Sequence, residues 1–142
     1  MTDPVSRSPD CAQVTVDLAA LGRNYETMRE KSGAAQAAAV IKADAYGLGM
    51  AEIVPKLLAM GCRSFFVALE KEGHAARALA PDADIYVLNG LPAGAAQNFA
   101  EAGLRPLLDF FGANHRMADL LPRAWRAPRM CVCRYRLQPA GA

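Results

Sequence analysis

The apolar positions along the chain alternate between a helical spacing and short continuous runs. After Asp17, a candidate N-cap, apolar residues recur at steps of three and four, which predicts an amphipathic helix that ends near Gly33. Its apolar stripe consists of Leu18, Leu21, Tyr25 and Met28. Short apolar runs predict strands at 14–16, 37–41, 65–69, 85–88 and 104–108. Further helices are predicted at 53–60, 70–79, 93–102 and 114–121, with Pro55 tolerable only near the first turn of its helix.

Strand and helix therefore alternate four or five times, which indicates parallel strands joined by helical crossovers. An open doubly wound sheet and a (β/α)8 barrel both use this unit, and the periodicity does not separate them. A closed barrel needs about 250 residues and at least about 200, so the 142 residues of this chain would supply about half of one. Residues 1–12, with Pro4, Ser6 and Pro9, are expected to form a disordered leader.

Composition narrows the functional classes. At 53% hydrophobic the chain is too apolar for disorder throughout and has enough apolar residues for a core. Its 16 basic and 14 acidic residues leave a net charge of +2, which gives no reason to expect nucleic acid as a partner. No apolar run approaches the roughly 20 residues that span a bilayer, and the N-terminus lacks the apolar region of a secretory signal. We therefore expect a cytoplasmic protein without a membrane partner.

The positions of cysteine and histidine do not predict a metal site. Cys131 and Cys133 lack the two-residue gap of zinc and redox motifs, and the other two cysteines stand apart. His74 and His115 are far apart in the sequence, and both are expected on the surface of helices. We expect ordinary thiols and no bound metal.

The segment 40–49, Val-Ile-Lys-Ala-Asp-Ala-Tyr-Gly-Leu-Gly, carries the most specific chemistry. It places Lys42 at the carboxyl end of an apolar strand, the edge at which parallel α/β folds build active sites. A lysine in water has a pKa of about 10.4, whereas desolvation at a strand end favours the neutral amine that attacks carbonyl groups. Tyr46 offers a hydroxyl near the same place. Gly47 and Gly49 allow close approach of the backbone ahead of a helix N-terminus, where an anion could be held.

On spacing alone, a lysine that ends a strand is more often a solvated edge residue than a Schiff-base lysine. Gly47 and Gly49 also lack the third glycine of a dinucleotide-binding fingerprint. The residue types by themselves leave both interpretations of Lys42 open.

The same segment resembles the lysine signature of the alanine racemase family, which are pyridoxal-phosphate-dependent barrel enzymes. The matching residues are Lys42-Ala43-Asp44-Ala45-Tyr46-Gly47 and Gly49, while Leu48 stands where the family usually has His. The similarity extends to the segments 14–18, 24–25, 87–92 and 105–108, and it covers residues 14–121.

This resemblance implies an α/β fold, a partial (β/α)8 TIM barrel with about the first four to five βα units, over residues 13–122. It implies pyridoxal 5'-phosphate as the cofactor, held covalently by Lys42 and bound at its phosphate by Tyr46. In the family the matching lysine is also the base on one face of the substrate α-carbon, and a tyrosine from a partner subunit acts on the other. The implied reaction is the interconversion of L-alanine and D-alanine, which supplies the cell wall, by a homodimeric full-length enzyme.

The second acid–base group and the remaining cofactor contacts of the family have no counterpart in this sequence. We therefore expect little or no racemase turnover from the chain by itself. The alternatives are an amino-acid decarboxylase or a cofactor carrier of the same barrel class, and a non-catalytic remnant that binds pyridoxal phosphate. The string from Lys42 to Gly49 favours the racemase over the two other barrel proteins.

From residue 123 the sequence changes character. Five arginines lie within 123–136, which would also suit a nucleic-acid or lipid contact, with Trp125 and Tyr135 as stacking surfaces. When permitted codons are chosen for residues 133–141 and are read one nucleotide later, they spell Val-Asp-Thr-Gly-Phe-Asn-Arg-Leu. That string resembles the next strand of the family. We expect residues 123–142 to form a non-homologous tail. We hypothesise that a one-nucleotide frameshift near residue 130 has truncated a gene of this family.

Sequencing the coding DNA tests the frameshift hypothesis. Shifting the reading frame by one nucleotide near codon 130 is expected to continue the resemblance to the racemase family, because the displaced frame already spells its next strand. A shifted frame that yields unrelated sequence would refute the hypothesis.

Overall fold

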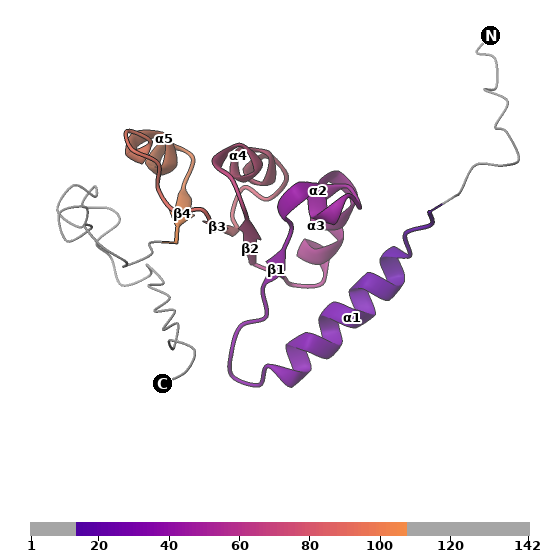
Figure 1. The fold of residues 1–142 in the computed structure, drawn as a ribbon. Helices are drawn as coiled ribbons and strands as arrows, with labels where there is room; N and C mark the ends of the chain where they lie inside the picture. The colour runs from indigo at the N-terminus through magenta and orange to yellow at the C-terminus, as the bar shows by residue number, and fades with distance from the viewer. Residues whose placement is uncertain (1–13, 108–142) are drawn as a thin grey trace, which may run out of the picture.

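The computed structural model describes residues 14–107, which form a four-stranded parallel sheet with helices along one side (Figure 1). The strands are β1 (Ala39–Val40), β2 (Ser64–Val67), β3 (Asp84–Val87) and β4 (Leu104–Pro106). The helices are α1 (Leu18–Lys31), α2 (Lys42–Tyr46), α3 (Met50–Ala59), α4 (Glu70–Leu79) and α5 (Ala96–Glu101). The predicted leader 1–12, the helix 114–121 and the tail 123–142 lie outside the described residues.

The order of the strands separates the two architectures that the periodicity left open. Each strand pairs in parallel with the next strand along the chain, in the order β1-β2-β3-β4. A doubly wound sheet reverses its order at a switch point, whereas a barrel adds each strand beside the previous one. Residues 14–107 therefore have the topology of the first strands of a (β/α)8 barrel, as the resemblance implied.

The two faces of the sheet have different environments. The residues paired in register on the helix-covered face are almost fully buried: Phe65, Ile85 and Leu104. The opposite face carries Val40, Phe66, Tyr86 and Arg105, which are more exposed. Burial of the first set against α3, α4 and α5 holds the helices on one side of the strands.

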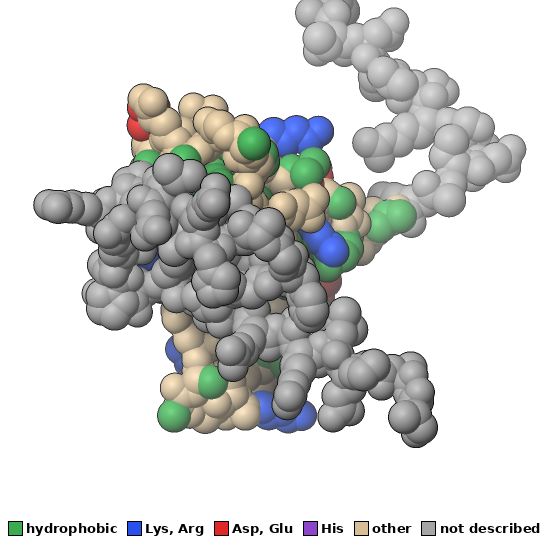
Figure 2. Space-filling model, turned by 60° about the vertical axis from the view of Figure 1, so that its left-hand side comes forward, with side chains coloured by type: hydrophobic (Ala, Val, Ile, Leu, Met, Phe, Trp, Pro, Cys, Tyr) green, Lys and Arg blue, Asp and Glu red, His purple; other side chains and the backbone are tan. Residues whose placement is uncertain are grey.

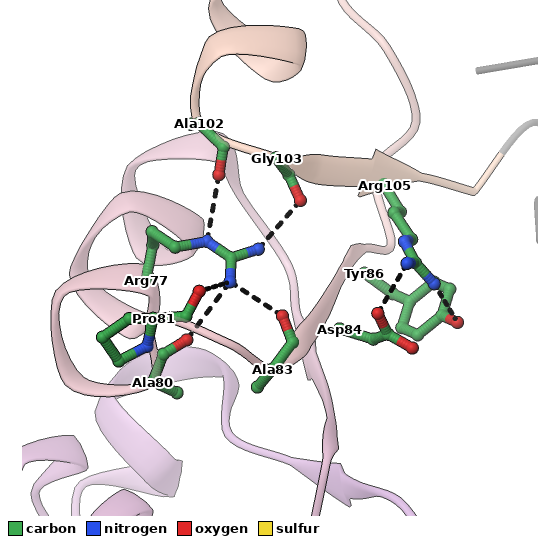
Figure 3. A network of polar contacts seen from close by, with 9 residues as sticks. All are labelled: Arg77, Ala80, Pro81, Ala83, Asp84, Tyr86, Ala102, Gly103 and Arg105. Carbon is green, nitrogen blue, oxygen red and sulfur yellow. Dashed lines mark hydrogen bonds and ion pairs between the residues drawn. The ribbon is translucent and has the colours of Figure 1, made fainter. Parts of the chain in front are cut away.

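A polar and aromatic ladder crosses the less buried face. The rings of Phe66 and Tyr86 stack with centroids 4.8 Å apart. The Arg105 guanidinium donates to the Tyr86 hydroxyl at 3.1 Å and pairs with Asp84 at 2.6 Å (Figure 3). These contacts join β2, β3 and β4 across the strands.

Helix α1 begins and packs as the sequence predicts, apart from one position. The Asp17 carboxylate accepts hydrogen bonds from the N–H groups of Ala19 and Ala20, which makes Asp17 the N-cap. Tyr25 is buried, and its hydroxyl donates to the Ala37 carbonyl at 3.2 Å. Burial, with a smaller effect from the nearby Cys62, raises the pKa of Tyr25 to about 12, so the hydroxyl remains a donor. Met28, predicted to lie on the buried stripe, is 62% exposed.

The predicted strand at 14–16 is wrong. Residues 14–17 have no strand pairing, and Val14 and Val16 are exposed. A strand needs a neighbouring backbone to complete its hydrogen bonds, and residues 14–107 provide none at this place. The apolar run alone does not reveal whether such a neighbour exists.

The expectation for Pro55 was also wrong, because Pro55 lies in the second turn of α3 rather than near its first. Proline cannot donate to the carbonyl of Ala51, one turn earlier. Both residues are exposed, so water can bond that carbonyl instead. No helix was predicted at α2, whereas the other helices and strands differ from prediction mainly at their ends; for example, α5 is shorter than the predicted 93–102.

Where described residues are visible in Figure 2, Lys and Arg side chains appear as separate spots and not as one patch. Within residues 14–107 no helix is both long and apolar enough to cross a membrane.

Arg77 joins the last turn of α4 to the starts of β3 and β4 (Figure 3). Its Nε and Nη2 donate to the carbonyls of Ala102 and Gly103 at 3.0 and 2.9 Å. Its Nη1 donates to the carbonyls of Ala80, Pro81 and Ala83 at 3.2, 2.7 and 2.8 Å. One planar guanidinium thus satisfies carbonyls from two loops that precede neighbouring strands.

Arg77→Lys is expected to lower the free energy of unfolding by about 2–4 kcal/mol, because a compact ammonium cannot reach both loops and leaves carbonyls without donors. Chemical denaturation monitored by circular dichroism measures this loss. Arg23→Lys, an exposed arginine on α1, is the matched control and should change stability by less than about 0.5 kcal/mol. Equal stability of the two variants would contradict the role given to Arg77.

Candidate functional site

Lys42 lies at the carboxyl edge of the sheet, as predicted. The Ile41 N–H still donates to the Phe66 carbonyl at 2.8 Å, so pairing with β2 continues up to the residue before Lys42. Ile41 is buried on the helix-covered side, whereas the Lys42 side chain is half-buried. Lys42 forms no ion pair with any acidic side chain of residues 14–107. Within the described residues the amine is therefore not bound to a carboxylate, and the residue is partly exposed.

The structure brings together the two side chains that the sequence singled out. The Lys42 Nζ lies 5.9 Å from the centroid of the Tyr46 ring, over its face. Tyr46 is 63% exposed, and its hydroxyl makes no hydrogen bond within the described part of the chain. At the edge of the sheet, an amine without an ion pair thus lies over the ring of a tyrosine whose hydroxyl has no hydrogen-bond partner within residues 14–107.

The backbone that follows Lys42 winds left-handed. Ala43, Asp44, Ala45 and Tyr46 have φ values of 50°, 52°, 55° and 57°. For L-residues this conformation costs roughly 1–2 kcal/mol each, and it occurs mostly at single residues. Four consecutive non-glycine residues therefore require support from the surrounding structure. These residues make up α2 after Lys42, and we call residues 43–46 the left-handed turn.

Glycine is required at the two positions after the left-handed turn because of the backbone conformation there. It is not required by a neighbouring atom that would leave no room for a Cβ. Gly47 and Gly49 have φ values of 79° and 92°, which glycine adopts without steric cost. A Cβ added at either position would meet no described atom within 4 Å. The close approach predicted for these glycines does not involve another part of residues 14–107.

Asp44 links the left-handed turn to helix α3. Its Oδ1 accepts a hydrogen bond from the Met50 N–H, the first of that helix, at 2.7 Å. Gly49, the N-cap residue, has no side chain to do so. The sequence predicted that an anion could be held at this helix N-terminus. In the structure the Met50 N–H donates instead to the carboxylate of Asp44.

Glu72 links the left-handed turn to the end of β2. Its Oε1 accepts from the Ala43 N–H at 2.9 Å, and its Oε2 accepts from the N–H groups of Ala68 and Leu69 at 2.8 and 3.2 Å. Partial burial by itself would raise the pKa of Glu72. The three backbone donors, aided by the charge of Lys71, outweigh that effect and hold the pKa below its ordinary value. A charged carboxylate therefore bridges the carboxyl ends of β1 and β2.

The sequence pattern did not predict a separate functional role for Asp44 or Glu72. A glutamate three residues after a helix N-cap is half of a capping box, and this signal was present at Glu72. Leu69 at the N-cap has no side-chain oxygen, which weakened the signal. The Ala43 N–H comes from 29 residues earlier, so no local pattern reveals that contact.

The described histidine lies on the surface of a helix, as predicted, and the described cysteine is buried. Cys62 is a buried free thiol whose Sγ lies 3.4 Å from the Ser64 carbonyl oxygen. His74 is exposed on α4, with its Nε2 3.5 Å from Glu70. Within residues 14–107 no three His, Cys, Asp or Glu side chains gather closely enough to hold a metal ion. Cys131, Cys133 and His115 lie outside the described residues.

Comparison with known proteins places this chain beside one family. Residues 16–130 match the family described as alanine racemase, N-terminal domain. The chain is 50% identical over 101 residues to an alanine racemase of Methylobacterium sp. (strain 4-46), covering 71% of this chain and 28% of that protein. It is 49% identical over 98 residues to an alanine racemase of Rhizobium meliloti (strain 1021), covering 69% of this chain and 26% of that protein.

A solved structure shows the same arrangement of the backbone. The crystal structure of alanine racemase from Bartonella henselae with covalently bound pyridoxal phosphate superposes with a TM-score of 0.64 at 40% identity. The match covers 66% of this chain and 28% of that chain. In each comparison the present chain spans little more than a quarter of the length of the protein that it resembles.

The lowered pKa of Glu72 predicts an acid-sensitive contribution to stability. A depressed pKa in the folded state stabilises the fold fully above the ordinary value of 4.5, and this contribution is lost as the pH falls through the folded value. Unfolding free energies measured from about pH 6 to about pH 3 should therefore fall more steeply in the wild type than in Glu72→Gln. Glu70→Gln, on the same helical turn, is the control for loss of a carboxylate that accepts none of these backbone hydrogen bonds. Parallel curves for wild type and Glu72→Gln would contradict this prediction.

Proposed function

The chain belongs to the alanine racemase family, and from this premise we propose that it provides the cofactor-binding lysine of a pyridoxal-phosphate-dependent enzyme that interconverts L-alanine and D-alanine. The observation that carries the proposal is the position of Lys42, at the carboxyl edge of a parallel sheet and beside Tyr46. The activity is proposed for the whole enzyme, because the chain spans 28% of the first relative's length.

The residues present fit pyridoxal phosphate in two respects. The Lys42 amine has no ion pair within residues 14–107 and the residue is partly exposed, so the amine can react with the cofactor aldehyde. The exposed Tyr46 hydroxyl has no partner among the same residues and can donate to a phosphate oxygen. When bound, pyridoxal phosphate supplies a conjugated system that accepts the electrons left at the α-carbon when its proton departs.

Lys42 is also the proposed base for the α-proton on its own side of the substrate. The carboxylates of Asp44 and Glu72 lie at the same edge, but both accept backbone hydrogen bonds that stabilise the left-handed turn. Neither is therefore proposed as the base. Tyr46 is the last residue of the left-handed turn that follows Lys42, and the lysine nitrogen lies over its ring. Inversion requires proton transfer on two opposite faces, and Lys42 serves one of them.

A second candidate function is cofactor binding without turnover. It is favoured by this one-sided arrangement within residues 14–107. The opposite face would be served by a second copy of the full-length enzyme, which we propose to be homodimeric. A cytoplasmic location remains a prediction from the sequence.

Borohydride trapping tests the proposed role of Lys42. The purified chain incubated with pyridoxal phosphate is expected to give a yellow adduct, which borohydride fixes and peptide mapping assigns to Lys42. Lys42→Ala should abolish this label, because it removes the only amine placed beside Tyr46 among the described residues. Lys71→Ala, an exposed lysine on α4, is the matched control and should keep it.

Racemisation of L-alanine, measured on the same samples, shows whether this chain turns over substrate by itself. Adduct formation with racemisation supports catalysis by this chain, and adduct formation without racemisation supports cofactor binding by this chain, with turnover left to the whole enzyme. A wild-type chain with no adduct at Lys42, or with equal labelling of Lys42 and Lys71, would refute both.

A further inference from the structure

The left-handed turn has a partner outside its own segment that reaches the peptide next to Lys42. The Ala43 N–H belongs to the same peptide unit as the Lys42 carbonyl, and it donates to Glu72 Oε1 at 2.9 Å. A hydrogen bond to this N–H fixes the plane of the Lys42–Ala43 peptide. The Ile41–Lys42 peptide is held as well, since the Ile41 carbonyl accepts from the Ala45 N–H at 2.9 Å. With the peptides on both sides of the Lys42 Cα held, the side chain leaves the backbone in a fixed direction.

The other end of this contact is firmly attached to the sheet. Glu72 Oε2 accepts from the N–H groups of Ala68 and Leu69, directly after β2. Glu72 itself lies in the first turn of α4, whose packing buries the adjacent Gly73. The carboxylate therefore uses both oxygens at once, one toward the turn of Lys42 and one toward the neighbouring strand end. A side chain with a single acceptor oxygen cannot maintain both contacts.

The strain in the left-handed turn explains why a stabilising contact from Glu72 is needed. Ala43 has a φ of 50° without being glycine, and three more residues follow in the same conformation. Such a backbone persists only where its surroundings hold it. Asp44 supports the far end of the turn through Met50, and Glu72 supports the end next to Lys42. If the Ala43 contact is lost, the near end can relax toward the ordinary right-handed region, and the lysine moves with it.

We propose that Glu72 is a positioning residue that aims the Lys42 amine at the aldehyde of pyridoxal phosphate. The inference rests on the proposed function and adds a residue that does not touch the cofactor. In the step concerned, the Lys42 nitrogen forms a C=N bond with the aldehyde carbon, and the aldehyde oxygen leaves as water. Glu72 exchanges no proton in this step; it holds the peptide from which the lysine extends.

Three variants separate positioning from general stability. Glu72→Gln keeps the size of the side chain but leaves one acceptor oxygen, so the bridge is broken. Glu72→Asp keeps the charge and both oxygens but is one methylene shorter, so it can cap α4 without reaching Ala43. Glu70→Gln makes the same change of charge on the same helical turn, where the side chain meets only His74 among the described residues.

The measurement is the equilibrium constant for formation of the pyridoxal-phosphate adduct, followed by its visible absorbance well below each variant's melting temperature. Loss of one charge-assisted hydrogen bond should weaken the adduct about tenfold in Glu72→Gln and Glu72→Asp, and Glu70→Gln should stay within about twofold of wild type. After borohydride trapping, the ratio of label at Lys42 to label at Lys71 should fall in both Glu72 variants. Destabilisation alone would expose all lysines and would not selectively reduce this site.

The outcomes distinguish this inference from the proposed function. A wild-type adduct at Lys42 that is equally strong in Glu72→Gln and Glu72→Asp overturns the positioning role and leaves the proposed function standing. A wild-type chain that forms no adduct overturns both. If Glu72→Gln does not fold, Glu72→Asp decides: weakened labelling at Lys42 in a folded chain supports the proposal, and wild-type labelling overturns it.

Discussion

The left-handed turn after Lys42 is the constraint on which the candidate site depends. Residues 43–46 hold positive φ values without a glycine among them, and a backbone in that state relaxes unless other contacts oppose it. Two carboxylates oppose it from different directions: Asp44 bonds the start of α3, and Glu72 bonds the end of β2. The amine of Lys42 is presented at the sheet edge because this backbone is held.

The sheet makes those contacts possible by fixing where its strand ends lie. Parallel pairing in sequential order brings the ends of β1 and β2 beside each other, so a side chain in α4 can reach both. At the opposite end of the strands, Arg77 performs a comparable task by joining α4 to the loops before β3 and β4. A carboxylate at one end and a guanidinium at the other thus tie the same helix to the sheet through backbone hydrogen bonds.

Much of the fold could be predicted because its signals are local. The bounds predicted for α4 match those observed, and Asp17 caps α1 as expected, since capping and periodicity involve residues within one or two turns. The predicted strand at 14–16 was wrong because a strand depends on a neighbour that the run itself does not specify. Met28 was misplaced for a similar reason: its spacing suits the buried stripe, but no described element covers it.

For the site, the sequence by itself determined that a lysine ends an apolar strand, that a tyrosine follows in the same turn, and that the string around them resembles one family. These are facts of order and residue type, and they required no distances. Only the tertiary structure decided the hand of the turn, the order of the strands and the bridge from Glu72 to Ala43. The physical reason is that a peptide N–H and a carboxylate 29 residues apart meet only after the intervening strand and helix have packed.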